Sequence, residues 1–101
     1  MEIKLVVLGP LKLPSGSREE LIECPTSVNV MEFFRIAEQK FGLELRKLVF
    51  QEGSGEIRRS IAICLNRKGL IGSRRIEFFD GLETELNAHD ELIVFMPVCG
   101  G

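Results

Sequence analysis

Few side chains in this 101-residue sequence have the chemistry of a catalytic or metal-binding site. Three cysteines, Cys24, Cys64 and Cys99, are widely spaced, and His89 is the single histidine. This set contains neither a Cys-x-x-Cys metal knuckle nor a disulfide framework, and it leaves no histidine pair for acid–base chemistry. We therefore expect reduced thiols, no metal site and no autonomous enzyme, so that any chemistry must use another group.

The other candidate group is the carboxylate at the end of the sequence, which reads Pro97, Val98, Cys99, Gly100, Gly101. Glycines adopt backbone angles that are closed to other residues and carry no side chain that would block a narrow channel. The five residues span about 16 Å at 3.3 Å per residue. A carboxylate is a poor electrophile at neutral pH, so a partner must first activate it, commonly as an acyl-adenylate. The tail therefore predicts Gly101 as the reacting residue and Gly100 as its necessarily small neighbour.

The composition is that of one globular domain. The chain is 45% hydrophobic and 28% charged with a net charge of −2, and at this length one core forms without metal or disulfide staples. Even the longest apolar runs, such as 92–96, are far shorter than the roughly 20 residues of a membrane span. The sequence opens on a strand-like run without a leader. We expect a cytoplasmic protein without membrane contact, with a globular domain over 1–96 and a flexible tail over 97–101.

Charge is distributed unevenly along the chain. Residues 44–75 carry eight basic and three acidic side chains, whereas 76–101 carry six acids and no base. The acidic last quarter either favours a basic partner or is an ordinary solvated face. Three pairs of basic residues are the only candidates for phosphate contacts: Arg58-Arg59, Arg67-Lys68 and Arg74-Arg75. The chain has neither Trp nor Tyr to stack on bases. We therefore expect no nucleic-acid partner.

Short runs rich in β-branched and other apolar residues predict the strands. The run 3–8 stops at a Gly-Pro pair, and 20–24 follows a turn-rich stretch, so the two predict a hairpin. Further strands are predicted over 61–65 and 92–96, and a minor strand over 76–79. Cys24 and Cys64 fall in predicted strands and are expected in the core.

The clearest local signal is a helix that begins after Asn29. Asn29 can cap the helix, and Glu32 can complete a capping box. Gly42 is predicted to end it as a left-handed cap. Segment 44–51 is either a second short helix or irregular, and we expect the glycine-containing loop 52–56 after it to be mobile. Five apolar residues at helical spacing form one stripe that packs on a sheet: Val30, Phe33, Phe34, Ala37 and Phe41. These elements predict an α+β fold, a mixed sheet of four to five strands on one main helix.

Three motifs in the last quarter carry a family resemblance. They are the turn D-G-L-E-T-E-L at 80–86, the stretch D-E-L-I-V-F at 90–95, and the tail with Pro97, Val98 and the final Gly-Gly. With Asn66 at the end of a middle strand, they resemble the β-grasp, ubiquitin-like sulfur carriers of the MoaD/ThiS type, the small subunit of molybdopterin synthase and its thiamine-pathway relative. The chain departs from the family pattern at Arg67 and at 88–89, where glycine and an acid–glycine pair are usual, and at Met96, which replaces a proline.

The resemblance implies a cycle in which the carrier supplies the reacting atom and no acid–base residue. An adenylating enzyme of the ubiquitin-activating type would use ATP to activate Gly101, and a persulfide donor would convert it to a thiocarboxylate. The sulfur would pass to a precursor held by the large subunit of molybdopterin synthase or by another acceptor. The carrier itself would bind no cofactor. Leu82 and Phe95 beside the exit strand, with Pro97, Val98 and Cys99 in the tail, are the candidate partner contacts.

Two other functions fit the same sequence. The first is a ubiquitin-like modifier, in which a lysine amine attacks the activated Gly101 and forms an isopeptide bond. The second is a non-covalent β-grasp interaction module whose tail has no role. Conjugates that disappear when Gly101 is deleted distinguish the modifier, and indifference to loss of Gly100 and Gly101 distinguishes the interaction module.

Overall fold

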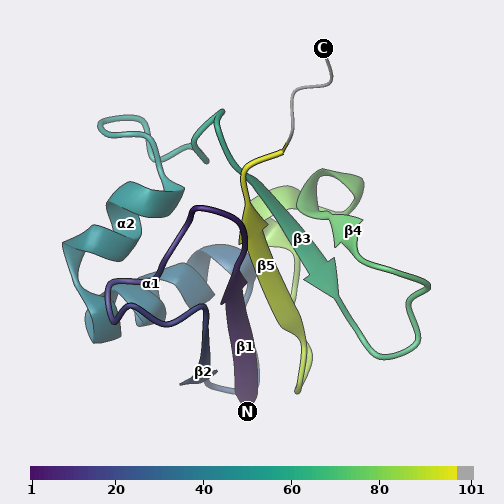
Figure 1. The fold of residues 1–101 in the computed structure, drawn as a ribbon. Helices are drawn as coiled ribbons and strands as arrows, with labels where there is room; N and C mark the ends of the chain where they lie inside the picture. Colours follow the sequence, from purple (N-terminus) through teal and green to yellow (C-terminus); the bar gives the residue numbers. More distant parts are fainter. Residues whose placement is uncertain (98–101) are drawn as a thin grey trace.

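A five-stranded mixed sheet forms the frame of the protein, which a computed structural model describes over residues 1–97 (Figure 1). The strands lie in the order β2-β1-β5-β3-β4. β1 pairs antiparallel with β2 and parallel with β5, while β5 and β4 both pair antiparallel with β3. The predicted hairpin and the strand near the C terminus are therefore confirmed. Their bounds are β1 Glu2–Val7, β2 Glu19–Glu23, β3 Ala62–Asn66, β4 Arg74–Arg75 and β5 Glu91–Phe95.

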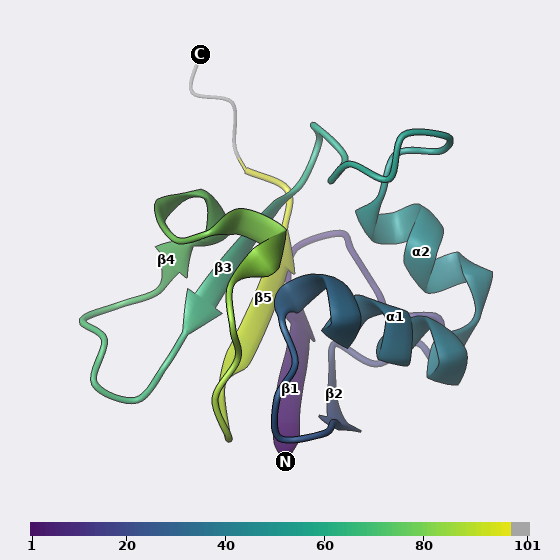
Figure 2. The same cartoon turned by 180° about the vertical axis from the view of Figure 1, so that it is seen from behind.

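Two helices, α1 (Val30–Phe41) and α2 (Leu43–Val49), cover one face of this sheet (Figure 2). The core lies between them and the inward residues of the strands, among which Leu5, Leu92 and Val94 are fully buried. Among residues 1–97, no helix lies on the opposite face of the sheet (Figure 1). The α+β fold with one main helix, predicted from the order of elements, is confirmed, and segment 44–51 is resolved as largely helical.

The start of α1 is as the sequence predicts. The side chain of Asn29 accepts a hydrogen bond from the backbone N–H of Glu32 at 2.8 Å, and the Glu32 side chain accepts one from the Asn29 N–H at 3.1 Å. Four residues of the predicted stripe are buried and Phe41 is half-buried. The end of the helix requires a correction. Gly42 has the positive φ of +80° that favours glycine, but its ψ of −168° is extended, so it is not a left-handed cap.

The minor strand predicted over 76–79 is wrong. The second edge strand, β4, ends at Arg75, and Ile76–Phe78 forms a 3₁₀ helix, η1. The apolar residues Ile76 and Phe79 are three positions apart, which places both on one side of a 3₁₀ turn, where they pack against the core. Phe78 points elsewhere and is 74% exposed. A second 3₁₀ helix, η2 (Gly81–Glu83), follows and contacts α1.

The two cysteines within residues 1–97 are both buried, as predicted, but only one belongs to the core under the helices. Cys24 packs in that core. Cys64 is buried in β3, where it pairs with Ile93 of β5 and lies on the opposite face of the sheet. Over residues 1–97, no helix combines the length and the apolar character needed to cross a bilayer.

Candidate functional site at the exit of the last strand

The chain leaves the folded domain at the end of β5, where Phe95 is the last strand residue and Met96 and Pro97 follow. The predicted reacting residue Gly101, its neighbour Gly100 and the predicted contacts Val98 and Cys99 lie outside the described residues. The described part of the candidate site is therefore the surface around the exit. β5 stands between β1 and β3, so the exit lies at the middle of one end of the sheet (Figure 1).

Strand register determines which side chains lie beside the exit on the helix-free face, named here the open face. Phe95 pairs with Ala62 of β3 in the row nearest the exit. In the next row, Ile93 pairs with Val6 of β1 on one side and with Cys64 on the other. Alternation along the strands places all of these side chains away from the core residues Leu92 and Val94. Two rows of the open face next to the exit are therefore mainly apolar.

Leu8 extends this apolar surface beyond the end of β1. Its backbone N–H donates a hydrogen bond to the Val94 carbonyl at 3.0 Å, so it continues alongside β5, and its side chain is 46% exposed. We name this surface the exit patch; its accessible members are Val6, Leu8, Ile93 and Phe95, and the buried side chains of Ala62 and Cys64 lie in the same rows. Met96, 45% exposed, follows it directly along the chain.

The row farther from the exit is polar. Glu91 pairs with Lys4 and with Asn66 across the three central strands. The Asn66 side-chain amide donates to Glu91 Oε1 at 3.4 Å, and Lys4 Nζ lies 3.8 Å from Glu91 Oε2. The open face thus changes from polar to apolar toward the exit. A protein that binds this face with an apolar surface would therefore sit next to the exit and could bind in only one orientation.

Leu82 lies on the other side of the sheet from Phe95. It belongs to η2, is half-buried and packs against the core. The Thr84 hydroxyl fixes this turn, since it accepts a hydrogen bond from the Asp80 N–H at 3.1 Å and donates one to the Gly81 carbonyl at 2.7 Å. The structure does not bring Leu82 and Phe95 onto one face, so a partner that contacts both would have to wrap around the end of the sheet.

An ion pair that sequence reasoning missed precedes β5. Asp90 is almost fully buried, and the Arg67 guanidinium donates to both of its carboxylate oxygens, from Nε at 3.0 Å to Oδ1 and from Nη2 at 2.8 Å to Oδ2. This hydrogen bonding raises the pKa of Arg67. Asp90 also accepts the Asn87 N–H at 2.7 Å, and Arg67 Nη2 donates to the Glu85 carbonyl. The signal in the sequence was arginine at a position where the family pattern has glycine.

Neither His89 nor the described cysteines form a reactive centre. His89 is exposed at a turn with φ +68°, and its backbone N–H donates to the Glu2 carbonyl. Burial raises the pKa of the Cys24 thiol, and it also raises that of Cys64 although the charge of Arg75 opposes it. Both thiols are therefore protonated near neutral pH. Over residues 1–97, no three His, Cys, Asp or Glu side chains meet in a group that could hold a metal ion.

Comparison with solved structures identifies the fold. The small archaeal modifier protein 1 of Methanosarcina acetivorans is 25% identical with a TM-score of 0.74, and the match covers 99% of this chain and 96% of that one. A chain of the BexX/CysO complex of Amycolatopsis orientalis is 21% identical, with a TM-score of 0.69 over 98% of this chain and 99% of that one. The third is a putative molybdopterin converting factor, subunit 1, from Pyrococcus furiosus, with 23% identity and a TM-score of 0.63 over 97% and 99%.

Neither a family model nor a curated protein sequence matches the chain. Each structural match covers almost the whole length of this chain and of the matched chain, so the similarity extends over the whole domain. It confirms the predicted β-grasp fold. The similar structures thus include a small archaeal modifier protein and a putative molybdopterin converting factor subunit.

Proposed function

Because this chain has the β-grasp fold of the ubiquitin-like sulfur carriers, we propose that it is a sulfur carrier whose terminal Gly101 is adenylated and converted to a thiocarboxylate. The observation that carries the proposal is the position of β5. This strand leads into the sequence Pro97-Val98-Cys99-Gly100-Gly101 at the apolar end of the open face, so a partner can grip the exit patch while the tail enters its active site.

The chemistry requires three steps that other proteins catalyse. The Gly101 carboxylate attacks the α-phosphate of ATP, so pyrophosphate leaves and an acyl-adenylate forms. A persulfide then attacks the acyl carbon through its terminal sulfur, AMP leaves, and an acyl disulfide remains. A second thiol reduces that disulfide and releases the thiocarboxylate. The carrier supplies the acyl group and its presentation, and within residues 1–97 the cysteine thiols are buried and protonated, so they do not compete as nucleophiles.

The first candidate for the receiving pathway is molybdopterin biosynthesis, with the large subunit of molybdopterin synthase as acceptor. The tail motif and the similarity to a putative molybdopterin converting factor subunit support this assignment. An adenylating enzyme and a persulfide donor complete the set of partners. That one similar chain comes from a BexX/CysO complex supports recognition through protein partners.

The test is intact-protein mass spectrometry after incubation with an adenylating enzyme, ATP and a persulfide donor. A thiocarboxylate increases the mass by the difference between sulfur and oxygen. Because oxidation of Met96 or Cys99 gives nearly the same increment, fragmentation has to locate the change at Gly101. A chain without Gly100 and Gly101 is the control and must stay unmodified. Release of no AMP and no increment with several such enzymes contradicts the proposal.

The second candidate is a protein modifier conjugated through Gly101. The observation that favours it is the similarity to small archaeal modifier protein 1, at 25% identity and a TM-score of 0.74. Carrier and modifier share the acyl-adenylate and differ in the nucleophile, which is a sulfur for the carrier and a lysine amine for the modifier. In cell extract, covalent adducts that depend on ATP and on Gly101 identify the modifier. If neither adducts nor thiocarboxylate depend on Gly101, the domain is a non-covalent interaction module.

A further inference from the structure

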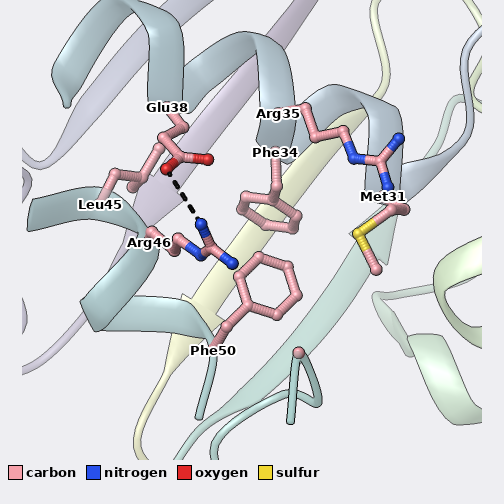
Figure 3. Close-up of a pocket in the computed structure, with 8 residues that line it drawn as sticks. Met31, Phe34, Arg35, Glu38, Leu45, Arg46 and Phe50 are labelled. Carbon is pink, nitrogen blue, oxygen red and sulfur yellow. Dashed lines mark ion pairs between the residues drawn. The ribbon is translucent and has the colours of Figure 1, made fainter. Parts of the chain in front are cut away.

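A second surface with the features of a binding site lies in the helix layer, on the side of the sheet opposite the exit patch. A hollow of about 200 Å³ opens between α1 and α2 (Figure 3). Its floor is aromatic, because the rings of Phe34 and Phe50 meet edge to face with centroids 5.7 Å apart. Met31 and Leu45 complete the apolar lining, and the loop at Gly55 forms one wall. We name this hollow the helix-layer pocket.

Two guanidinium groups stand at the rim of the pocket on either side of the rings (Figure 3). Arg46 has one acidic neighbour, Glu38, whose Oε1 lies 3.7 Å from Nη1, which is too long for a good hydrogen bond. No ion pair joins Arg35 to an acid of residues 1–97. The rim is therefore net positive, and an incoming carboxylate can pair with Arg35 and compete with Glu38 for Arg46 at little cost.

The size of the pocket restricts what can fill it. Sites for drug-sized ligands and cofactors occupy about 300–1,000 Å³, so a hollow of about 200 Å³ suits one large side chain. An apolar floor under two cations matches an apolar side chain with carboxylates next to it. A neutral apolar segment would leave Arg35 without an acidic partner, and a purely acidic one would leave the aromatic floor uncovered.

We propose that the helix-layer pocket binds an acidic peptide segment of a partner protein, which inserts one large apolar side chain over Phe34 and Phe50. Carboxylates on either side of that side chain pair with Arg35 and Arg46. The site faces away from the open face, so it can be occupied while the exit patch and the tail are engaged elsewhere. This inference does not depend on sulfur transfer, because no residue of the pocket belongs to the exit patch.

The test uses a synthetic acidic pentapeptide with one central tryptophan between glutamates. The protein has no Trp and no Tyr, so fluorescence excited at the red edge of tryptophan absorption comes from the peptide alone. The expected result is a saturable blue shift as the indole leaves water. The double variant Arg35→Glu/Arg46→Glu is expected to weaken binding at least about tenfold. A peptide with lysines in place of the glutamates should not bind.

A matched variant separates the pocket from general electrostatics. Lys12→Glu/Lys68→Glu makes the same change in net charge at exposed positions outside the lining and should keep the wild-type affinity. Circular dichroism verifies that both double variants fold. Equal weakening by the two double variants would overturn the proposal, and so would the absence of a saturable shift in the peptide fluorescence as wild-type protein is added up to about 1 mM.

Discussion

The Arg67 guanidinium binds both carboxylate oxygens of Asp90, a residue 23 positions away and 1% exposed. This two-point contact ties the end of β3 to the start of β5. Removal of one partner from such a pair leaves a charge with little water around it, which costs more than the intact pair contributes.

The first prediction follows from this contact. Asp90→Ala and Arg67→Met should each lower the free energy of unfolding by about 2–4 kcal/mol. The loss should be larger for Arg67→Met, which leaves the buried Asp90 carboxylate without its cation, than for Asp90→Ala, which leaves a guanidinium that reaches solvent. Together they should lower it by less than the sum, because the second substitution removes a charge that the first left unpaired. Urea unfolding of the four proteins measures the coupling, and strictly additive effects would show that the pair does not act as a unit.

The second prediction concerns His89, whose φ of +68° is strained for a residue with a Cβ atom. His89→Gly should raise the free energy of unfolding by up to about 1 kcal/mol, because glycine adopts this φ angle without strain. The greater conformational entropy of glycine in the unfolded chain offsets only part of this gain. His89→Ala keeps the Cβ atom and should give no such gain. If alanine stabilises as much as glycine, the imidazole and not the backbone is the source of the effect.

The third prediction concerns the thiols of Cys24 and Cys64. Burial raises their pKa values, so the folded state keeps their protons at a pH where the unfolded chain has lost them. Since the folded state then binds more protons than the unfolded state, the free energy of unfolding should fall as the pH rises above the ordinary thiol pKa and should be insensitive to these groups below it. The double variant Cys24→Ala/Cys64→Ala should lack this decrease in the free energy of unfolding at alkaline pH, apart from the part that lysines contribute. Urea unfolding of both proteins over a range of pH measures the difference.

The same burial predicts slow alkylation. In native protein at neutral pH, iodoacetamide should modify Cys24 and Cys64 far more slowly than it does after denaturation in urea. Peptide mapping by mass spectrometry gives each rate separately. Native and denatured rates that agree would mean that the two side chains are accessible to solvent on the time scale of the reaction.

The fourth prediction tests the exit patch within the proposed function. Phe95→Glu should raise the KM of the adenylating enzyme for this protein by about tenfold or more, since a charge replaces an aromatic side chain in the row of the exit patch nearest the tail. The kcat at saturation should change little, because Gly101 and the tail remain intact. Leu21→Glu is the matched control: Leu21 is 53% exposed and pairs with Lys4 at the polar end of the open face. An equal effect of the two variants would place the docking surface elsewhere.

The features that depend on residues close together along the chain could be predicted from the sequence. The capping box of Asn29 and Glu32 and the apolar stripe of α1 were both confirmed, because each depends on residues within a few turns of one helix. The prediction over 76–79 failed because a short apolar run fits a strand or a 3₁₀ turn equally well, and only the packing of Ile76 and Phe79 against the core distinguishes them.

What the sequence could not provide is the arrangement of residues that are distant along the chain. The exit patch exists because Val6, Cys64 and Ile93 share one row, and this depends on register across three strands. The helix-layer pocket likewise needs the angle between α1 and α2. The reacting end, Gly101, was identified from the sequence alone and lies beyond residues 1–97, so its role stays a prediction that the mass measurement decides.

The place of β5 between β1 and β3 also affects the order in which the domain is made. β5 is the last strand in the sequence, yet it supplies the pairing that joins the N-terminal hairpin to the β3–β4 pair. While β5 is still inside the ribosome, the emerging chain has two separate half-sheets with unpaired inner edges, which are exposed to aggregation. The pairing of β5 with β1 and β3 is therefore the closing step of folding, and the apolar rows of the open face are complete only after it.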